Sequence, residues 1–187
     1  AAFNDKAGSV VAGNTCDYAA VHGKAIRAEG QPFHSCSNEA FCNDSTLRRG
    51  AWTVDLICGK QVAVPTVNGG VKHRIFPARM QEAIRSYTSG GGNIIVSGAY
   101  IGTDIWDQVY PVESDEDFRK SSIEFAQKVL GYRWQGNIAS RNGTAIPYGE
   151  DFNKVGILET YNSQNAVSYC VEAPDGIAPA SSDARTV

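Results

Sequence analysis

The sequence lacks the features that mark several protein classes. Its 187 residues carry 17 basic and 20 acidic side chains, for a formal net charge of −3. Nucleic-acid binders and polybasic membrane-surface proteins rely on concentrated positive charge, which is missing here. No apolar run approaches the ~20 residues that span a bilayer, and no P-loop or G-x-G-x-x-G follows the first expected strand. We therefore expect no nucleic-acid partner, no transmembrane segment and no cofactor.

Histidine and cysteine are sparse, and their spacing does not suit a metal site. Zinc needs ligands that converge at tight spacing, and no C-x-x-C pair is present. The three histidines, His22, His34 and His73, show no ligand spacing either. We therefore expect no metal and interpret the cysteines as small buried apolar side chains, with a disulfide left open; they are Cys16, Cys36, Cys42, Cys58 and Cys170.

The residues that are present describe a globular chain. Hydrophobic residues make up 42% and charged residues 20%, as in ordinary folded domains. The length suits one domain, so we interpret residues 1–187 as a single domain. The chain begins without Met or a signal peptide and stops soon after the segment Pro174 to Pro179. We expect it to be a fragment of a larger multidomain protein.

Strand and helix patterns alternate along the first two thirds of the chain. Apolar runs predict strands at residues 9–12, 33–36, 52–58 and 93–97. Caps and helical periodicity predict helices at 15–28, 77–87 and 114–129, and a capped turn or short helix at 37–41. This order favours a mostly parallel sheet with helices on both faces, an αβα sandwich of three layers.

The pattern changes from Tyr132 onward. Arg141 to Thr144 is a strong hairpin signal, and short apolar runs follow at residues 155–158 and 166–169. We expect antiparallel strands to be added to the sheet in the C-terminal third.

The run from Gly98 to Gly102 follows the clearest strand and is the most informative segment. A strand followed by glycine, any residue, a nucleophile, any residue and glycine is typical of a nucleophile elbow, a tight strand-to-helix turn. Its centre here is Tyr100, whose phenol has an ordinary pKa of about 10 and attacks amides and esters poorly at neutral pH. The segment is either an elbow without its usual chemistry or a glycine-rich turn with an aromatic lid.

Candidate functional residues follow from the expected sheet, whose strands end together at one working edge. The ligand-binding candidates at that edge are Asn14, Lys60, Gln61, Ser97 and Asp104. The catalytic candidates are Tyr100, His22 and Asp17, with His22 as an acid–base group or, alternatively, a structural histidine. Lys60 would be the cation that lowers the pKa of the Tyr100 phenol.

The tryptophans offer a second kind of site. Trp52, Trp106 and Trp134 have large apolar faces that can stack on sugar rings, although aromatic side chains more often pack in a core or at its rim.

The stretch from Tyr87 to Asp107 resembles the central strand and elbow of class I glutamine-amidotransferase-like domains. More closely, the chain is similar to a domain within secreted bacterial proteins of the xanthan lyase type. Three segments, Val11–Lys24, Val54–Gln61 and Gly91–Asp104, carry that likeness, and a weaker one covers Tyr169–Pro179. The resemblance implies a flavodoxin-like sheet and a secreted, periplasmic or cell-surface location.

The same resemblance departs from active amidotransferases in two ways. Tyr100 stands where they have the nucleophilic cysteine, and no histidine follows Tyr161. We therefore expect no glutaminase. The leading hypothesis is a non-catalytic or cryptic accessory module of a polysaccharide- or envelope-processing protein, with other domains of its parent and a polysaccharide as partners. The alternative is a polysaccharide lyase or hydrolase with a non-standard site around Tyr100 and His22.

Overall fold

The computed structural model describes residues 3–4, 9–10, 18–65, 67–68, 70–107, 116–139, 144–152, 155–159 and 174–186. Contacts divide the chain into two units. The first holds residues 1–33, 138–173 and 186–187, and the second holds residues 34–137 and 174–185. Both helices and strands are present, so the fold class is mixed α/β.

The first unit combines one helix with short paired strands in its described part. Its elements are α1 (Tyr18–Ala28), the antiparallel pair β1 (Phe3–Asn4) and β2 (Ser9–Val10), the antiparallel pair β8 (Thr144–Ala145) and β9 (Leu158–Glu159), and the 3₁₀ turn η2 (Glu150–Phe152). The strand expected at 9–12 thus pairs antiparallel with β1 over its described residues. The predicted cap Thr15, the turn at 141–143 and the strand at 166–169 lie outside the described residues.

The helix α1 ends as predicted, but the segment after it is not the expected strand. Gly30 has a φ of 70°, a conformation that glycine adopts without steric cost and that ends helices. Phe33 then packs against the buried Gly23, where an added Cβ would lie 2.8 Å from the ring. Because Phe33 is held by the helix and not by a strand ladder, residues 33–36 are irregular. The strand predicted there is wrong.

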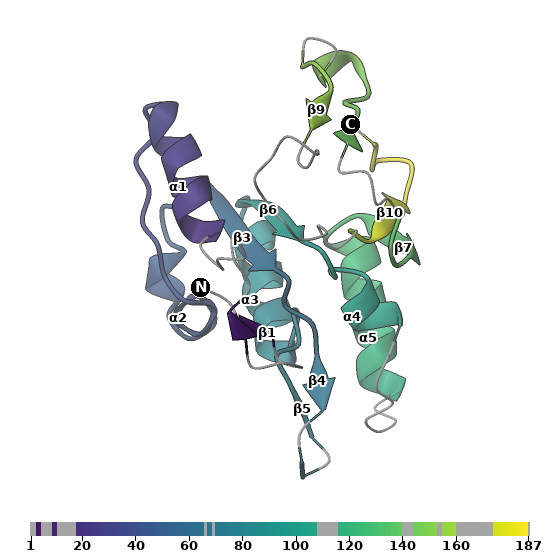
Figure 1. The fold of residues 1–187 in the computed structure, drawn as a ribbon. Coiled ribbons are helices and arrows are strands. Elements are labelled where there is room, and N and C mark those ends of the chain that lie inside the picture. Colours follow the sequence, from purple (N-terminus) through teal and green to yellow (C-terminus); the bar gives the residue numbers. More distant parts are fainter. Residues whose placement is uncertain are drawn as a thin grey trace. The chain divides into compact units, whose positions relative to one another are not determined.

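The second unit is built on the parallel pair β3 (Thr53–Gly59) and β6 (Asn93–Gly98), which lie side by side in Figure 1. Alternate residues of β3, including Leu56 and Cys58, are buried, as expected when one face of a strand packs on helices. Both strands were predicted, and their parallel pairing confirms that part of the expected sheet.

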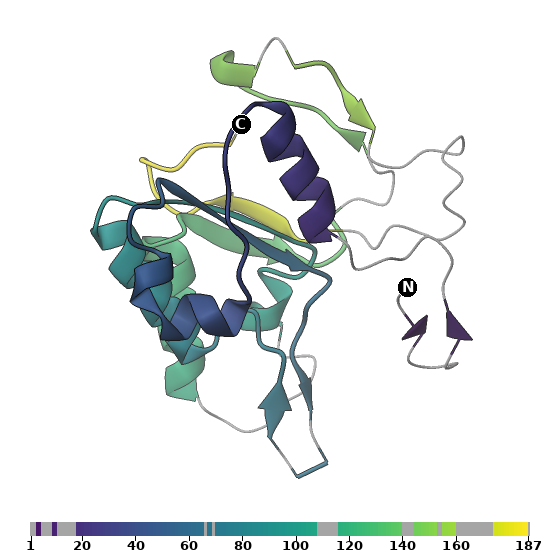
Figure 2. The ribbon, with the colours of Figure 1, turned by 90° about the vertical axis from the view of Figure 1, so that its left-hand side faces the viewer.

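Four helices accompany this pair in the described residues. They are α2 (Asn38–Asn43), α3 (Ala78–Ser89), α4 (Thr103–Trp106) and α5 (Glu116–Lys128), with the 3₁₀ turn η1 (Ser45–Leu47) after α2. The Ser37 side chain caps α2 by accepting from the Ala40 N–H at 3.2 Å, and Pro77 precedes α3. These boundaries agree with the predicted helices at 37–41 and 77–87. In Figure 2, α2, α3 and α5 lie on the same side of the strands of this unit.

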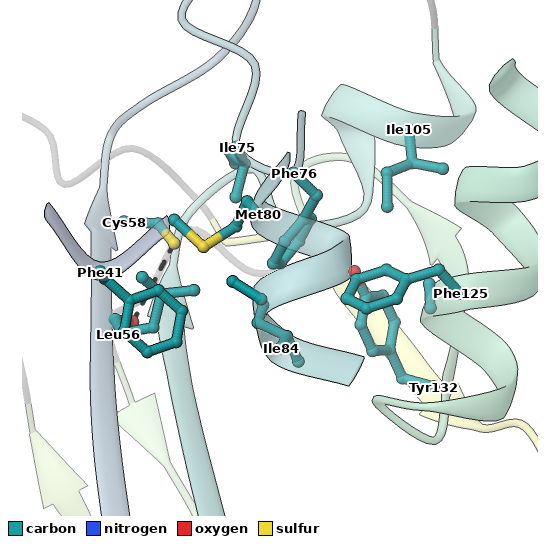
Figure 3. Packing of buried hydrophobic residues seen from close by; sticks show 12 residues of the cluster. Phe41, Leu56, Cys58, Ile75, Phe76, Met80, Ile84, Ile105, Phe125 and Tyr132 are labelled. Atoms are coloured by element: carbon teal, nitrogen blue, oxygen red, sulfur yellow. Dashed lines mark hydrogen bonds between the residues drawn. The ribbon is translucent and has the colours of Figure 1, made fainter. Parts of the chain in front are cut away.

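The core lies between those strands and helices. Met80 and Ile84 of α3 occupy its middle (Figure 3), with Leu56 of β3 on one side and Phe125 of α5 on the other. The rings of Phe76 and Phe125 have centroids 5.5 Å apart, a tilted arrangement that suits aromatic quadrupoles. The helical periodicity that predicted α3 and α5 therefore marked their buried faces correctly.

Two further antiparallel pairs complete the second unit. The strands β7 (Tyr132–Gly136) and β10 (Gly176–Pro179) pair with each other, and β4 (Val64–Pro65) pairs with β5 (Val71–Lys72). Antiparallel strands were expected after Tyr132, although β7 and β10 themselves were not located. In the described part of the chain, no helix is long and apolar enough to cross a bilayer.

Candidate functional site

The ends of β3 and β6 meet at one edge, as parallel strands must. Gly59 and Gly98 are register partners, and the Ala99 N–H donates to the Gly59 carbonyl at 2.8 Å. Residues 58–63 and 97–104 therefore lie together, and we name this region the carboxyl edge. Of the predicted site residues, Lys60, Gln61, Ser97, Tyr100 and Asp104 belong to it.

The glycines of the predicted elbow serve close packing. A strand, a turn and the helix α4 follow one another, as an elbow requires. Neither Gly98 nor Gly102 has a positive φ; instead, a Cβ on Gly98 would lie 2.8 Å from the Cβ of Cys58, and one on Gly102 would strike the Trp134 ring. Small residues are needed here because neighbouring side chains cover them.

Tyr100, the centre of the elbow, is half-buried and packs against the hydrophobic core. The φ of Tyr100 is not positive, so its backbone lacks the strain that is typical of a nucleophile elbow. Its carbonyl accepts from the Asp104 N–H at 3.1 Å, at the start of α4. These contacts fit an aromatic side chain that closes the turn.

Asp104 binds the backbone of two other segments. Its carboxylate accepts from the Ala63 N–H at 2.6 Å and from the Ile75 N–H at 2.8 Å, and the residue is only 9% exposed. Burial raises the pKa of this carboxyl above its ordinary value, although the two N–H donors and Arg74 oppose that shift. Asp104 therefore fixes the segment after β3 and the approach to α3.

Asp175 is the residue of this region that the sequence did not reveal. Its carboxylate accepts from the Gly102 and Thr103 N–H groups, both at 2.6 Å, and from the Thr103 hydroxyl. Its own N–H donates to the Ala99 carbonyl at 2.9 Å. A carboxylate that collects the first N–H groups of a helix acts as its cap, and Asp175 does so from a segment 73 residues away.

The remaining polar candidates differ in their positions. The Gln61 side chain donates to the Arg74 carbonyl at 2.9 Å, while Lys60 and Ser97 are half-buried. His22 is half-buried on α1 and belongs to the first unit, whereas Tyr100 belongs to the second. Asn14 and Asp17 lie outside the described residues.

Burial favours the neutral form of two titratable groups, Cys58 of the carboxyl edge and the nearby Tyr132. Burial raises the pKa of the Cys58 thiol to about 12, so the reactive thiolate is scarce at neutral pH. Burial also raises the pKa of the Tyr132 phenol, whose hydroxyl donates to the Ile101 carbonyl at 2.6 Å. Neither group is prepared for nucleophilic or acid–base work.

The structure has a surface groove away from this edge. It lies between α3 and α5, is open to solvent and has a volume of about 790 Å³. The residues that line it include Gln81, Glu82, Arg85, Phe118 and Lys128. The predicted site residues take no part in it.

No group of three or more His, Cys, Asp or Glu side chains forms a metal-binding arrangement within the described ranges. No protein-family model, curated protein or solved structure matches the chain.

Proposed function

We propose that this chain is a non-catalytic, amidotransferase-like accessory module of a secreted protein that processes polysaccharide or envelope material. The observation that carries the proposal is the state of the carboxyl edge. The Gly102 and Thr103 N–H groups, at the start of α4 just behind Tyr100, are bonded to the carboxylate of Asp175. These backbone donors therefore stabilise the turn and are not available to a ligand.

The other groups of the edge support the same proposal. A general base must be within hydrogen-bond reach of a proton on the substrate, but the Asp104 carboxylate is buried against Ala63 and Ile75. The thiol of Cys58 is protonated and buried. Gln61, Asp104 and Asp175 thus hold backbone segments in place, which supports a structural role for this edge.

The proposal also covers the layers of the fold around β3 and β6. The parallel pair with helices α2, α3 and α5 on one side supplies two layers of a flavodoxin-like αβα sandwich. Parallel strands are ordinarily covered on both faces, so we propose a third helical layer on the other face. The proposed location outside the cell or at its surface rests on the resemblance to secreted proteins of the xanthan lyase type.

Catalysis is tested with the purified chain and three substrates. Xanthan and polygalacturonate are followed by the ultraviolet absorbance of unsaturated uronate products, and glutamine is followed by ammonia release. The expected result is no product above a heat-denatured control. Product that forms with the parent and disappears in Tyr100→Phe, but not in the matched Tyr148→Phe in the first unit, would establish the alternative enzyme.

A further inference from the structure

Trp52 differs from the other two tryptophans in its exposure. It is 87% exposed, whereas Trp106 and Trp134 are half-buried. An indole is one of the largest apolar surfaces that a side chain can offer. Its exposure makes Trp52 a candidate contact for a ligand with an apolar face.

The backbone beneath Trp52 is firmly held. The Ala51 carbonyl accepts from the Tyr87 hydroxyl at 2.9 Å, and the Trp52 carbonyl accepts from both the N–H and the side-chain amide of Asn93, each at 3.0 Å. Tyr87 is itself buried in α3. These bonds fix the amino ends of β3 and β6, so the backbone that carries the indole needs no ordering when a ligand binds.

Exposed polar residues flank Trp52 along the chain and at the starts of β3 and β6. Thr53 and Asn93 are register partners at the strand starts, and both are exposed. Arg49 is exposed in the turn that leads into Trp52, where the Ala51 N–H donates to the Arg48 carbonyl at 3.3 Å. We name residues 49–53 and 93 the amino edge.

This combination favours a sugar over a protein partner. The core of a protein interface is a contiguous apolar patch depleted in charge, whereas the residues that flank Trp52 along the chain, Arg49 and Thr53, are exposed and polar. A sugar ring has an apolar face that stacks on indole and hydroxyls at its rim that need polar partners. The Arg49 guanidinium matches the carboxylate of an acidic sugar.

We propose that Trp52 is the stacking platform of a surface site for acidic polysaccharide, with Arg49 as the partner of the sugar carboxylate. The site deepens the proposed function, on which its ligand class rests, because it gives the module a way to hold polysaccharide without chemistry. It lies at the opposite end of β3 from Tyr100 and Asp104.

The test is native electrophoresis of the chain in gels that contain xanthan, an acidic polysaccharide, or hydroxyethyl cellulose, a neutral one. The parent should be retarded by xanthan, and Trp52→Ala should lose roughly tenfold or more in affinity, the loss typical of a central aromatic contact. Trp52→Phe should keep part of the retardation. Arg49→Gln should weaken retardation by xanthan more than by the neutral polymer. Val67→Ala removes an exposed apolar side chain from the β4–β5 turn and serves as the matched control.

Three outcomes overturn the site. They are a parent chain that migrates as it does in a plain gel, a Trp52→Ala variant retarded as strongly as the parent, and a parent dimer by light scattering that Trp52→Ala dissociates. The last would assign Trp52 to a contact between copies. Circular dichroism checks that each variant is folded. Failure of binding leaves the non-catalytic proposal intact, because only product formation refutes that proposal.

Discussion

At the carboxyl edge of β3 and β6, polar side chains are bonded to the chain's own backbone, whereas at the amino edge Trp52 is exposed to solvent. Open α/β sheets ordinarily bind ligands at their carboxyl edge. Here Asp104 and Asp175 accept from the Ala63, Gly102 and Thr103 N–H groups of that edge, so these donors stabilise the fold. The comparison teaches that a strand order can place residues together without leaving them available for a ligand.

The strongest test of the carboxyl edge is Asp175→Ala. The change leaves the Gly102 and Thr103 N–H groups and the Thr103 hydroxyl without their acceptor, in a buried turn. We expect the free energy of unfolding to fall by about 3 kcal/mol, measured by urea unfolding with tryptophan fluorescence. The control Asp183→Ala removes an exposed carboxylate and should change it by less than about 0.5 kcal/mol. Equal stability of parent and Asp175→Ala would show that the carboxylate is not a structural cap.

Asp104→Ala should have the next largest effect. The change leaves the Ala63 and Ile75 N–H groups without their acceptor, although removing a buried charge offsets part of that loss. We expect a loss of about 2 kcal/mol in the free energy of unfolding. Asp107→Ala, an exposed position just after α4, is the control and should leave stability unchanged.

The parent and the Asp104 variant should also differ in how their free energy of unfolding depends on pH. Burial raises the pKa of Asp104 in the folded state above its ordinary 3.8. A raised pKa means that the folded state binds the proton more tightly, so this group's contribution to stability is present below pH 3.8 and is lost as the pH rises through the folded value. The stability of the parent relative to Asp104→Ala should fall over that window. A difference that grows with pH would show that the N–H donors outweigh burial.

Gly102→Ala tests the packing account of the elbow. The added Cβ would strike the Trp134 ring, so we expect a loss of about 2 kcal/mol from overpacking. Gly136→Ala is the matched control, because nothing lies within 4 Å of the added Cβ and its φ is not positive. If both variants were equally stable, Gly102 would be needed for some other reason than the Trp134 contact.

The last prediction concerns the reactivity of the Cys58 thiol and involves no change in stability. With its pKa raised to about 12, the Cys58 thiol should react with iodoacetamide at pH 8 at least ~100-fold more slowly than the exposed Cys36. Peptide mass spectrometry after timed quenching measures both rates in one sample. Comparable rates would mean that Cys58 is accessible and ionised, and the edge would regain a candidate nucleophile.

Periodicity located the elements with strong local patterns. Met80, Ala83 and Ile84 identified α3, and the apolar run before Ser97 identified β6, because each pattern follows from burial of one face. The strand predicted at 33–36 failed because an apolar run of four residues does not distinguish a strand from a segment that packs on a helix. The alternation in Tyr132 to Gln135 would have revealed β7.

The candidate site was predictable only in its location. The parallel order predicted that Gln61 and Asp104 follow the ends of neighbouring strands, but nothing local shows that a carboxylate will accept from backbone N–H groups. Asp175 contacts Gly102 across 73 residues, and no motif marks such a pair. The exposure of Trp52 likewise depends on the tertiary arrangement, because its sequence context resembles the start of any strand.

The central claim is that the donors of the elbow are occupied by Asp175. Hydrogen exchange at the Gly102 and Thr103 amides, followed by NMR in the parent and in Asp175→Ala, tests it most directly. We predict slow exchange of both amides in the parent and much faster exchange in the variant, with the β6 amides still protected. Amides that exchange in the folded parent as fast as in an unstructured peptide would contradict the account and leave the edge open to a substrate.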